Sequence, residues 1–177
     1  MVVEIKLFEL QKNYTLRSFM DQVKYVGIVD FDALYKMMTQ WFIERDYDFY
    51  EGMYKDKPPE LELDWVAKRK VNDFYQYKFE IYFHLWDIRE VDVIKDGVKK
   101  KMIETRMMIQ FSPILRIDWQ DRWTGNWFIK TMFKFYTENV IKREIELKYA
   151  DTLWYHFYNL QGKVKDCLGM ETGGNAY

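Results

Sequence analysis

Few residues in this chain have the chemistry of a nucleophile or a general base, and their spacing brings no set of them together. They are Ser18, Ser112, Cys167, His84 and His156. Nucleophilic catalysis needs a nucleophile, a base and an orienting group within hydrogen-bond reach. Ser112 precedes a proline and is explained by a turn, and Cys167 is predicted to be a small buried side chain on the last turn of a helix. We therefore predict no catalytic residues.

The two histidines have structural explanations. His84 falls on the polar side of a predicted strand, opposite Glu60, where a surface ion pair is expected. His156 adjoins an apolar helical stripe, so we expect a histidine at the core boundary with its hydrogen bonds satisfied.

Carboxylates concentrate between residues 44 and 64. The acids concerned are Asp46, Asp48, Glu51, Glu60, Glu62 and Asp64. Such a group could hold a hard cation or supply a paired acid and base. A solvated outer face of a sheet explains the same pattern. With two His and one Cys there is no zinc-ligand spacing, and no EF-hand loop is present. We predict no metal and no cofactor.

A basic cluster surrounds Asp96-Gly97, formed by Lys95 and Lys99–Lys101. Nucleic-acid binding would combine such a cluster with exposed aromatic rings that stack on bases, and this segment has none. The net charge of −1 gives no overall attraction to a polyanion. No glycine-rich phosphate loop occurs either. Nucleic acid is therefore not an expected partner.

Aromatic residues make up 19% of the chain, and they crowd the predicted strand-to-helix junction at Trp119–Tyr136. This segment includes Trp119, Trp123, Trp127, Phe128 and Met132. Trp and Tyr are favoured where one side is apolar and the other is wet, as at partner interfaces and membrane surfaces. Lys130 and Lys134 fit a membrane surface. A core cluster that caps one end of the sheet is the alternative explanation.

The first half of the chain predicts a strand at residues 2–10 and a helix at 31–45. Apolar residues recur at helical spacing from Phe31 to Phe42, and Asp30 can cap the first turn. Residues 11–28 are ambiguous, with one short helix expected around Ser18–Tyr25.

From Tyr47 to Arg122 the apolar period changes to two, which predicts an antiparallel meander. A loop at 71–73 would place Trp65 opposite Phe79. With the same loop, Leu63 faces Ile81 and Leu61 faces Phe83. A turn at Asp96-Gly97 would pair Asp92 with Lys101, Arg89 with Glu104 and Asp87 with Arg106. Pro58-Pro59 separates two strands. Pro113 predicts an edge, a bend or a turn, with a last strand at 114–122.

The C-terminal third predicts a long helix from 127 to 168. Asn126 can cap its start and Gly169 its end, and a break is expected near 138–150 because one helix of this length is unusual in a globular domain. Residues 170–177 are expected to be a frayed tail.

The composition of the 177 residues predicts one globular domain over 1–169. The single Cys favours a reducing compartment, and no signal-peptide block or membrane span is visible, so a cytoplasmic protein is expected. The fold class is α+β. We expect an antiparallel meander sheet of five to six strands, with an N-terminal helix and long C-terminal helices packed on one face.

This order of elements resembles the helix-grip layout of START-type lipid-binding domains, the polyketide-cyclase-like superfamily. The resemblance implies an apolar cavity between the closing helix and a curved sheet. In this chain it would be lined by Trp65, Tyr75, Tyr77 and Phe79.

Three functions are therefore open. The first is a non-catalytic binding or assembly module, with a protein partner or self-association through the aromatic seam between Trp119–Tyr136 and the last helix. The second is a carrier of a hydrophobic small molecule or lipid in the helix-grip cavity. The third is a peripheral membrane protein.

Overall fold

The computed structural model describes residues 3–6, 22–95, 98–122, 127–140 and 142–170. In chain order the strands and longer helices are β1 (Val3–Lys6), β2 (Gln22–Val29), α2 (Phe31–Ile43), β3 (Asp48–Lys57), β4 (Glu60–Lys70), β5 (Tyr75–Lys95), β6 (Val98–Ile117), α3 (Trp127–Phe135) and α5 (Asp151–Cys167). Between α3 and α5 lie the π-helical segments Tyr136–Val140 and Ile145–Ala150 and the short helix α4 (Lys142–Glu144).

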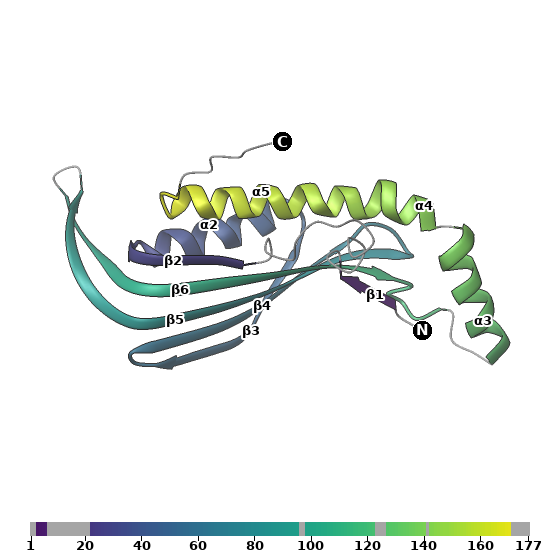
Figure 1. The fold of residues 1–177 in the computed structure, drawn as a ribbon, viewed down its shortest axis with the longest axis horizontal. Coiled ribbons are helices and arrows are strands. Elements are labelled where there is room, and N and C mark those ends of the chain that lie inside the picture. The colour runs from purple at the N-terminus through teal and green to yellow at the C-terminus, as the bar shows by residue number, and fades with distance from the viewer. Residues whose placement is uncertain (1–2, 7–21, 96–97, 123–126, 141, 171–177) are drawn as a thin grey trace.

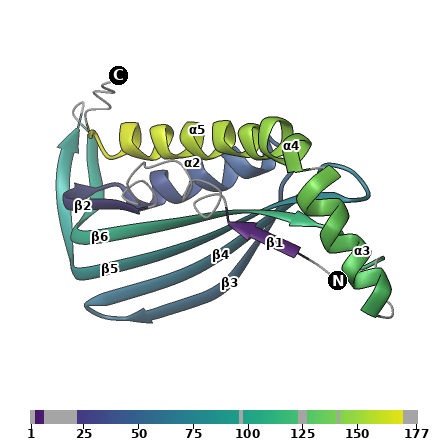
Figure 2. The same cartoon turned by 45° about the vertical axis from the view of Figure 1, so that its right-hand side comes forward.

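The strands form a six-stranded antiparallel sheet in which β3, β4, β5 and β6 are a meander. β6 also pairs with two further segments on its other side, β2 along residues 103–110 and β1 along residues 114–117. The helices α2 and α5 lie on the same face of the sheet (Figures 1 and 2). The predicted α+β class with an antiparallel sheet is confirmed.

The segment before α2 differs from its prediction. Residues 22–25 were expected to end a short helix, yet they belong to β2. Val23 and Val29 are buried, and every residue of β2 has a partner on β6. Pairing with a distant strand therefore outweighs a weak local helical preference. Residues 18–21 lie outside the described part of the chain.

The helix α2 forms as its sequence predicts. The Asp30 carboxylate accepts a hydrogen bond from the amide of Ala33 at 3.1 Å, which satisfies one of the donors left free at the helix start. One stripe of the helix is fully buried against the sheet and α5. It comprises Leu34, Met38, Trp41 and Phe42.

The helix α5, with the residues that flank it, also buries the stripe that its spacing predicts. The buried side chains are Tyr149, Leu153, Phe157, Leu160, Val164 and Leu168. Gly169 has a φ of +64°, and the amide of Met170 donates to the carbonyl of Lys165 at 2.9 Å. This left-handed residue ends the helix as expected. Cys167 is exposed, contrary to prediction, because it faces away from the buried stripe.

The pairing of β4 with β5 is shifted by two residues from the predicted register. Trp65 lies opposite Ile81, Leu63 opposite Phe83 and Leu61 opposite Leu85. The loop is longer than expected because the side chain of Asn72 organises it, accepting hydrogen bonds from the amides of Phe74 and Tyr75 at 2.8 and 2.7 Å. A shift of two keeps every side chain on its predicted face.

The second hairpin confirms two of its three predicted charge pairs. Asp92 lies opposite Lys101 and Arg89 opposite Glu104. A β-bulge between Trp86 and Arg89 then places Trp86, not Asp87, opposite Arg106, although Arg106 still forms an ion pair with Asp87 at 3.2 Å. Bulges bend strands, and beyond this one the β5–β6 hairpin curls toward the helices (Figure 1).

Pro113 does not end a strand, and the separate strand predicted at 114–122 is wrong. β6 runs without a break from Val98 to Ile117, with Pro113 opposite Phe79. On its other side, Pro113 falls between the residues paired with β2 and those paired with β1. A proline, which lacks an N–H, is tolerated where one side of a strand has no partner, as here among the described residues.

The expected break in the C-terminal helix is present. α3 lies at a steep angle to α5, with the short elements between them (Figures 1 and 2). Asn126 and residues 171–177 lie outside the described residues, so the predicted cap and tail stay predictions. None of the helices in the described ranges combines the length and apolarity needed to cross a bilayer.

The core is a network of aromatic rings, and Phe79 is central to it. Its ring is fully buried and lies 5.6 Å from the ring of Tyr47, 5.7 Å from that of Phe42 and 6.3 Å from that of Trp41.

We predict that Phe79→Ala lowers the free energy of unfolding by about 3–5 kcal/mol, because the substitution leaves a cavity in addition to removing buried apolar surface. Urea denaturation measures this change.

The matched control is Tyr50→Ala on β3, where the side chain is 67% exposed. That variant should stay within about 0.5 kcal/mol of the wild type. Equal losses in both variants would contradict the assignment of Phe79 to the core.

Candidate functional site

The four aromatic residues predicted to line a cavity lie in the core. Trp65, Tyr75, Tyr77 and Phe79 are each no more than 4% exposed. The indole of Trp65 lies 4.6 Å from the ring of Phe83 and donates to a carboxylate oxygen of Glu51 at 3.1 Å. Of the four residues, only Tyr77 lines one of the described pockets.

That pocket, the basic pocket, lies where β4 ends and α5 begins, and its volume is about 250 Å³. It is lined by Arg69, Lys70, Val71, Tyr77, Lys148, Tyr149 and Thr152. The described lining residues thus include three cations and no carboxylate. Sequence reasoning missed this site, because its two halves are separated by more than seventy positions and no local motif joins them.

The rim of the basic pocket is held by the loop before β5. The ring of Tyr149 stacks on Tyr75 at 3.9 Å, and its hydroxyl accepts a hydrogen bond from the side-chain amide of Asn72 at 3.3 Å. The indole of Trp119 donates to the carbonyl of Asn72 at 2.9 Å, and Lys70 lies over that indole at 5.3 Å. These contacts tie the end of β4 and the loop after it to Trp119, which follows β6, and to Tyr149, which precedes α5.

The structure does not present the predicted aromatic seam as one exposed surface. Trp119 is partly buried by the loop contacts just described. Trp123 lies outside the described residues. Trp127, Phe128 and Met132 are on α3 and are exposed.

The exposed side of α3, here called the α3 face, consists of Trp127, Phe128, Met132 and Phe135. Trp127 is 78%, Phe128 62% and Phe135 63% exposed. Phe133 is the buried residue of the same helix, and its ring lies 6.2 Å from that of Phe74. α3 therefore touches the body through Phe133 and leaves its other apolar side chains in water, at one end of the molecule (Figures 1 and 2).

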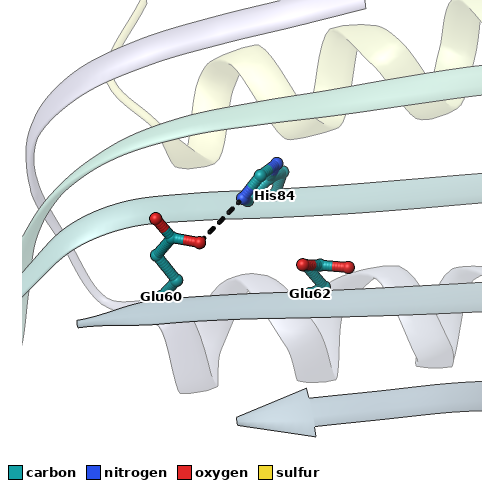
Figure 3. A group of neighbouring side chains, drawn as sticks. All are labelled: Glu60, Glu62 and His84. Carbon is teal, nitrogen blue, oxygen red and sulfur yellow. Dashed lines mark ion pairs between the residues drawn. The ribbon is translucent and has the colours of Figure 1, made fainter. Parts of the chain in front are cut away.

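A third group consists of Glu60 and Glu62 on β4 and His84 on β5. It lies on the face of the sheet that is turned away from the helices (Figure 3). The ligand atoms of these residues lie within 4.8 Å of one another, a distance compatible with one cation. Nε2 of His84 lies 3.7 Å from Glu60, which confirms the predicted ion pair, although Glu62 is the residue directly opposite His84.

The ammonium of Lys55 argues against a metal at this group. It lies 2.9 Å from Glu62, and this hydrogen bond lowers the pKa of the Glu62 carboxyl below its ordinary value. A cation would have to displace Lys55 to use that carboxylate. The group is explained by ion pairs on the outer face of the sheet.

His156 sits at the core boundary, as predicted. Its Nδ1 lies 2.8 Å from the hydroxyl of Tyr47, and the ring packs against Trp41 at 6.2 Å. Burial, together with the positive charges of Arg69 and Arg45, lowers the pKa of His156 to about 4. The imidazole is therefore neutral at physiological pH and suited to packing rather than to proton transfer.

Comparison of the chain with known protein families, with curated proteins and with solved structures finds no match. The function is therefore argued from the α3 face and the basic pocket.

The lowered pKa of His156 predicts a specific dependence of stability on pH. The unfolded histidine titrates near 6.5 and the folded one near 4, so the unfolded chain binds the extra proton between these values. The contribution of His156 to the free energy of unfolding is fully present above pH 6.5 and is lost as the pH falls toward 4. His156→Gln should remove this loss, which we expect to be about 1 kcal/mol because the half-buried ring is partly screened by water.

Urea denaturation of both proteins at several pH values between 7.5 and 4.5 measures the effect. The difference between wild type and variant at pH 7.5 reports lost contacts alone, and only the change in that difference at lower pH reports the titration. A difference that does not vary with pH would contradict the prediction.

Proposed function

We propose that the protein is a non-catalytic binding module that attaches to an anionic membrane surface through the α3 face. The observation that carries this proposal is the exposure of the four large apolar side chains of the α3 face, on one short helix at the end of the molecule. The sequence of that helix contains two lysines and no acid.

The apolar exposure on α3 is costly unless something covers it. Phe128, Met132 and Phe135 recur at positions i, i+4 and i+7, so they lie along one side of the helix. Burying a Phe or Met side chain fully is worth about 1.5–3 kcal/mol. The segment 127–147 also holds the greatest concentration of exposed apolar side chains among the described residues. Contiguous exposed apolar patches mark interaction sites.

The charges on α3 favour a membrane. Lys130 and Lys134 are its charged residues. Helices that lie in a membrane interface combine Trp and Phe with Lys or Arg, and each Lys near an anionic leaflet contributes about 1 kcal/mol. Trp127, at the start of the helix, is the residue type enriched at the level of the lipid headgroups.

The size of α3 argues against a dimer formed by this helix alone. Nine residues of α-helix span only about 14 Å, whereas a stable interface covers about 800 Å² on each partner. Assembly with another protein is the second candidate function, since anchors at i, i+4 and i+7 suit a hydrophobic groove on a partner.

The carrier function is less well supported. The order of β2, α2, the meander and α5 is compatible with a helix-grip arrangement, which stays a hypothesis. The rings of Trp65 and Phe79, which would line the cavity, are instead packed against other rings of the core.

Flotation with lipid vesicles tests the membrane proposal. The wild type should float with vesicles of phosphatidylcholine and phosphatidylserine, more at low salt than at high salt, and less with phosphatidylcholine alone. Phe128→Ser/Phe135→Ser should weaken binding roughly tenfold or more, because two ring insertions are lost.

The matched control is Tyr50→Ser/Tyr54→Ser, which removes two exposed rings from β3. It should float like the wild type. Absence of flotation at both salt concentrations would end the membrane proposal, and equal flotation of the two double variants would remove the role of α3. Size-exclusion chromatography with light scattering measures assembly. If the wild type does not float but forms a complex that Phe128→Ser/Phe135→Ser cannot form, the second candidate, assembly, is favoured.

A further inference from the structure

We propose that the basic pocket is a binding site for a phosphate group carried on a small organic molecule or a lipid. The pocket joins the end of β4, at Arg69 and Lys70, to the segment where α5 begins, at Lys148 and Thr152. This site does not depend on the α3 face.

Arg69 supplies the first argument. Its side chain is partly buried, and with the residues that the structure describes it makes neither a hydrogen bond nor an ion pair. The guanidinium carbon of Arg69 lies over the ring of Tyr47, at 5.9 Å from the ring centre. A guanidinium has five N–H donors in a planar fork that matches two oxygens of a phosphate. The donors of Arg69 are thus available to a ligand in the pocket.

The charge of the pocket supplies the second argument. Lys148 lies 3.8 Å from Glu144, an exposed pair that compensates it only weakly. Lys70 is in contact with the indole of Trp119. The positive charge of Arg69 also acts on its neighbours, since it contributes to the lowered pKa of His156. The pocket therefore has an excess of positive charge.

A neutral donor completes the lining. The hydroxyl of Tyr149 accepts a hydrogen bond from Asn72, which leaves its own proton available to a ligand. The hydroxyl of Tyr77 forms a hydrogen bond with Thr152, which in turn donates to the carbonyl of Lys148 at 2.8 Å. The phenol of Tyr149 thus adds one neutral donor beside the three cations.

The size and charge of the site select the ligand class. Pockets that enclose whole drug-sized ligands measure about 300–1,000 Å³, and this one, at about 250 Å³, suits a group of headgroup size. A phosphate monoester carries a charge of about −1.5 to −2. Three cations without a lining carboxylate match such a dianion better than they match a single carboxylate.

Two sources of the phosphate are compatible with the position of the pocket. The loop 71–74 contributes Val71 to the pocket and also contacts α3, through the pair Phe74 and Phe133. The headgroup of a lipid bound at α3 is one source. A soluble phosphate ester is the other, and both present the same chemistry to Arg69.

Isothermal titration of the full chain with inorganic phosphate and with glycerol 3-phosphate tests the site. The wild type should bind glycerol 3-phosphate, and Arg69→Gln/Lys148→Gln should weaken binding at least about tenfold, because hydrogen bonds to charged groups are lost. Arg69→Lys, which keeps the charge without the fork, should be weakened by an intermediate factor.

Lys57→Gln/Lys101→Gln is the matched control, because it makes the same change in net charge at exposed lysines away from the pocket. It should bind like the wild type. Urea denaturation of each variant confirms folding, and the single variant Lys148→Gln, at an exposed helical position, serves if the double variant is unstable. Lack of binding to both probes, or equal binding by the pocket and control variants, would overturn the proposal.

Vesicles distinguish the two sources. If the phosphate belongs to a lipid, the wild type should float better with phosphatidic acid than with phosphatidylserine, and the pocket variant should lose this preference. If it belongs to a soluble ester, glycerol 3-phosphate binds without any such preference. Phe128→Ser/Phe135→Ser should still bind glycerol 3-phosphate, so failure of the α3 face and failure of the pocket give different results.

Discussion

The arrangement of this molecule depends on the packing of aromatic rings between the sheet and two helices. Trp41 of α2 lies within 6.3 Å of Phe79 on β5, and its indole donates to the side chain of Asn159 on α5 at 2.8 Å. One residue thus joins α2, α5 and the sheet, with its polar atom satisfied and its ring in edge-to-face contact with Phe79. Because α5 is held in place in this way, Thr152 in its first turn and Lys148 just before it line the same pocket as Arg69 at the end of β4.

The same core leaves α3 outside. Not all aromatic residues are taken into the interior, and Trp127, Phe128 and Phe135 remain exposed on α3. This helix turns away from α5 (Figure 2). Phe133 returns to the body, where its ring lies beside that of Phe74. The loop that carries Phe74 also carries Asn72, which orders the rim of the basic pocket through Tyr149. The loop 71–74 therefore links the apolar surface to the cationic pocket, and the two proposed sites together would suit an amphiphile with an anionic headgroup.

Local patterns were reliable where side chains and backbone within a few residues settle the outcome. The cap at Asp30 and the alternation of β4 are examples. Predictions failed where a distant partner decided, as for β2, whose strand exists because β6 pairs with it. The register of β4 and β5 moved by two because Asn72 reorganised the loop, and the bulge at Asp87 moved one charge pair. The sequence indicated the aromatic residues at 119–136 but not which of them would be exposed.

Periodicity and capping residues determined the α+β class, the helix α2, the faces of the strands and the end of α5, because these features depend on contacts a few positions apart. Tertiary structure alone decided that Phe133 is buried while Phe135 is in water, since both residues have the same chemistry in the same helix. It also decided the basic pocket. Arg69 and Lys148 are distant in the chain, and only the packing of α5 across the sheet brings their charges to one place.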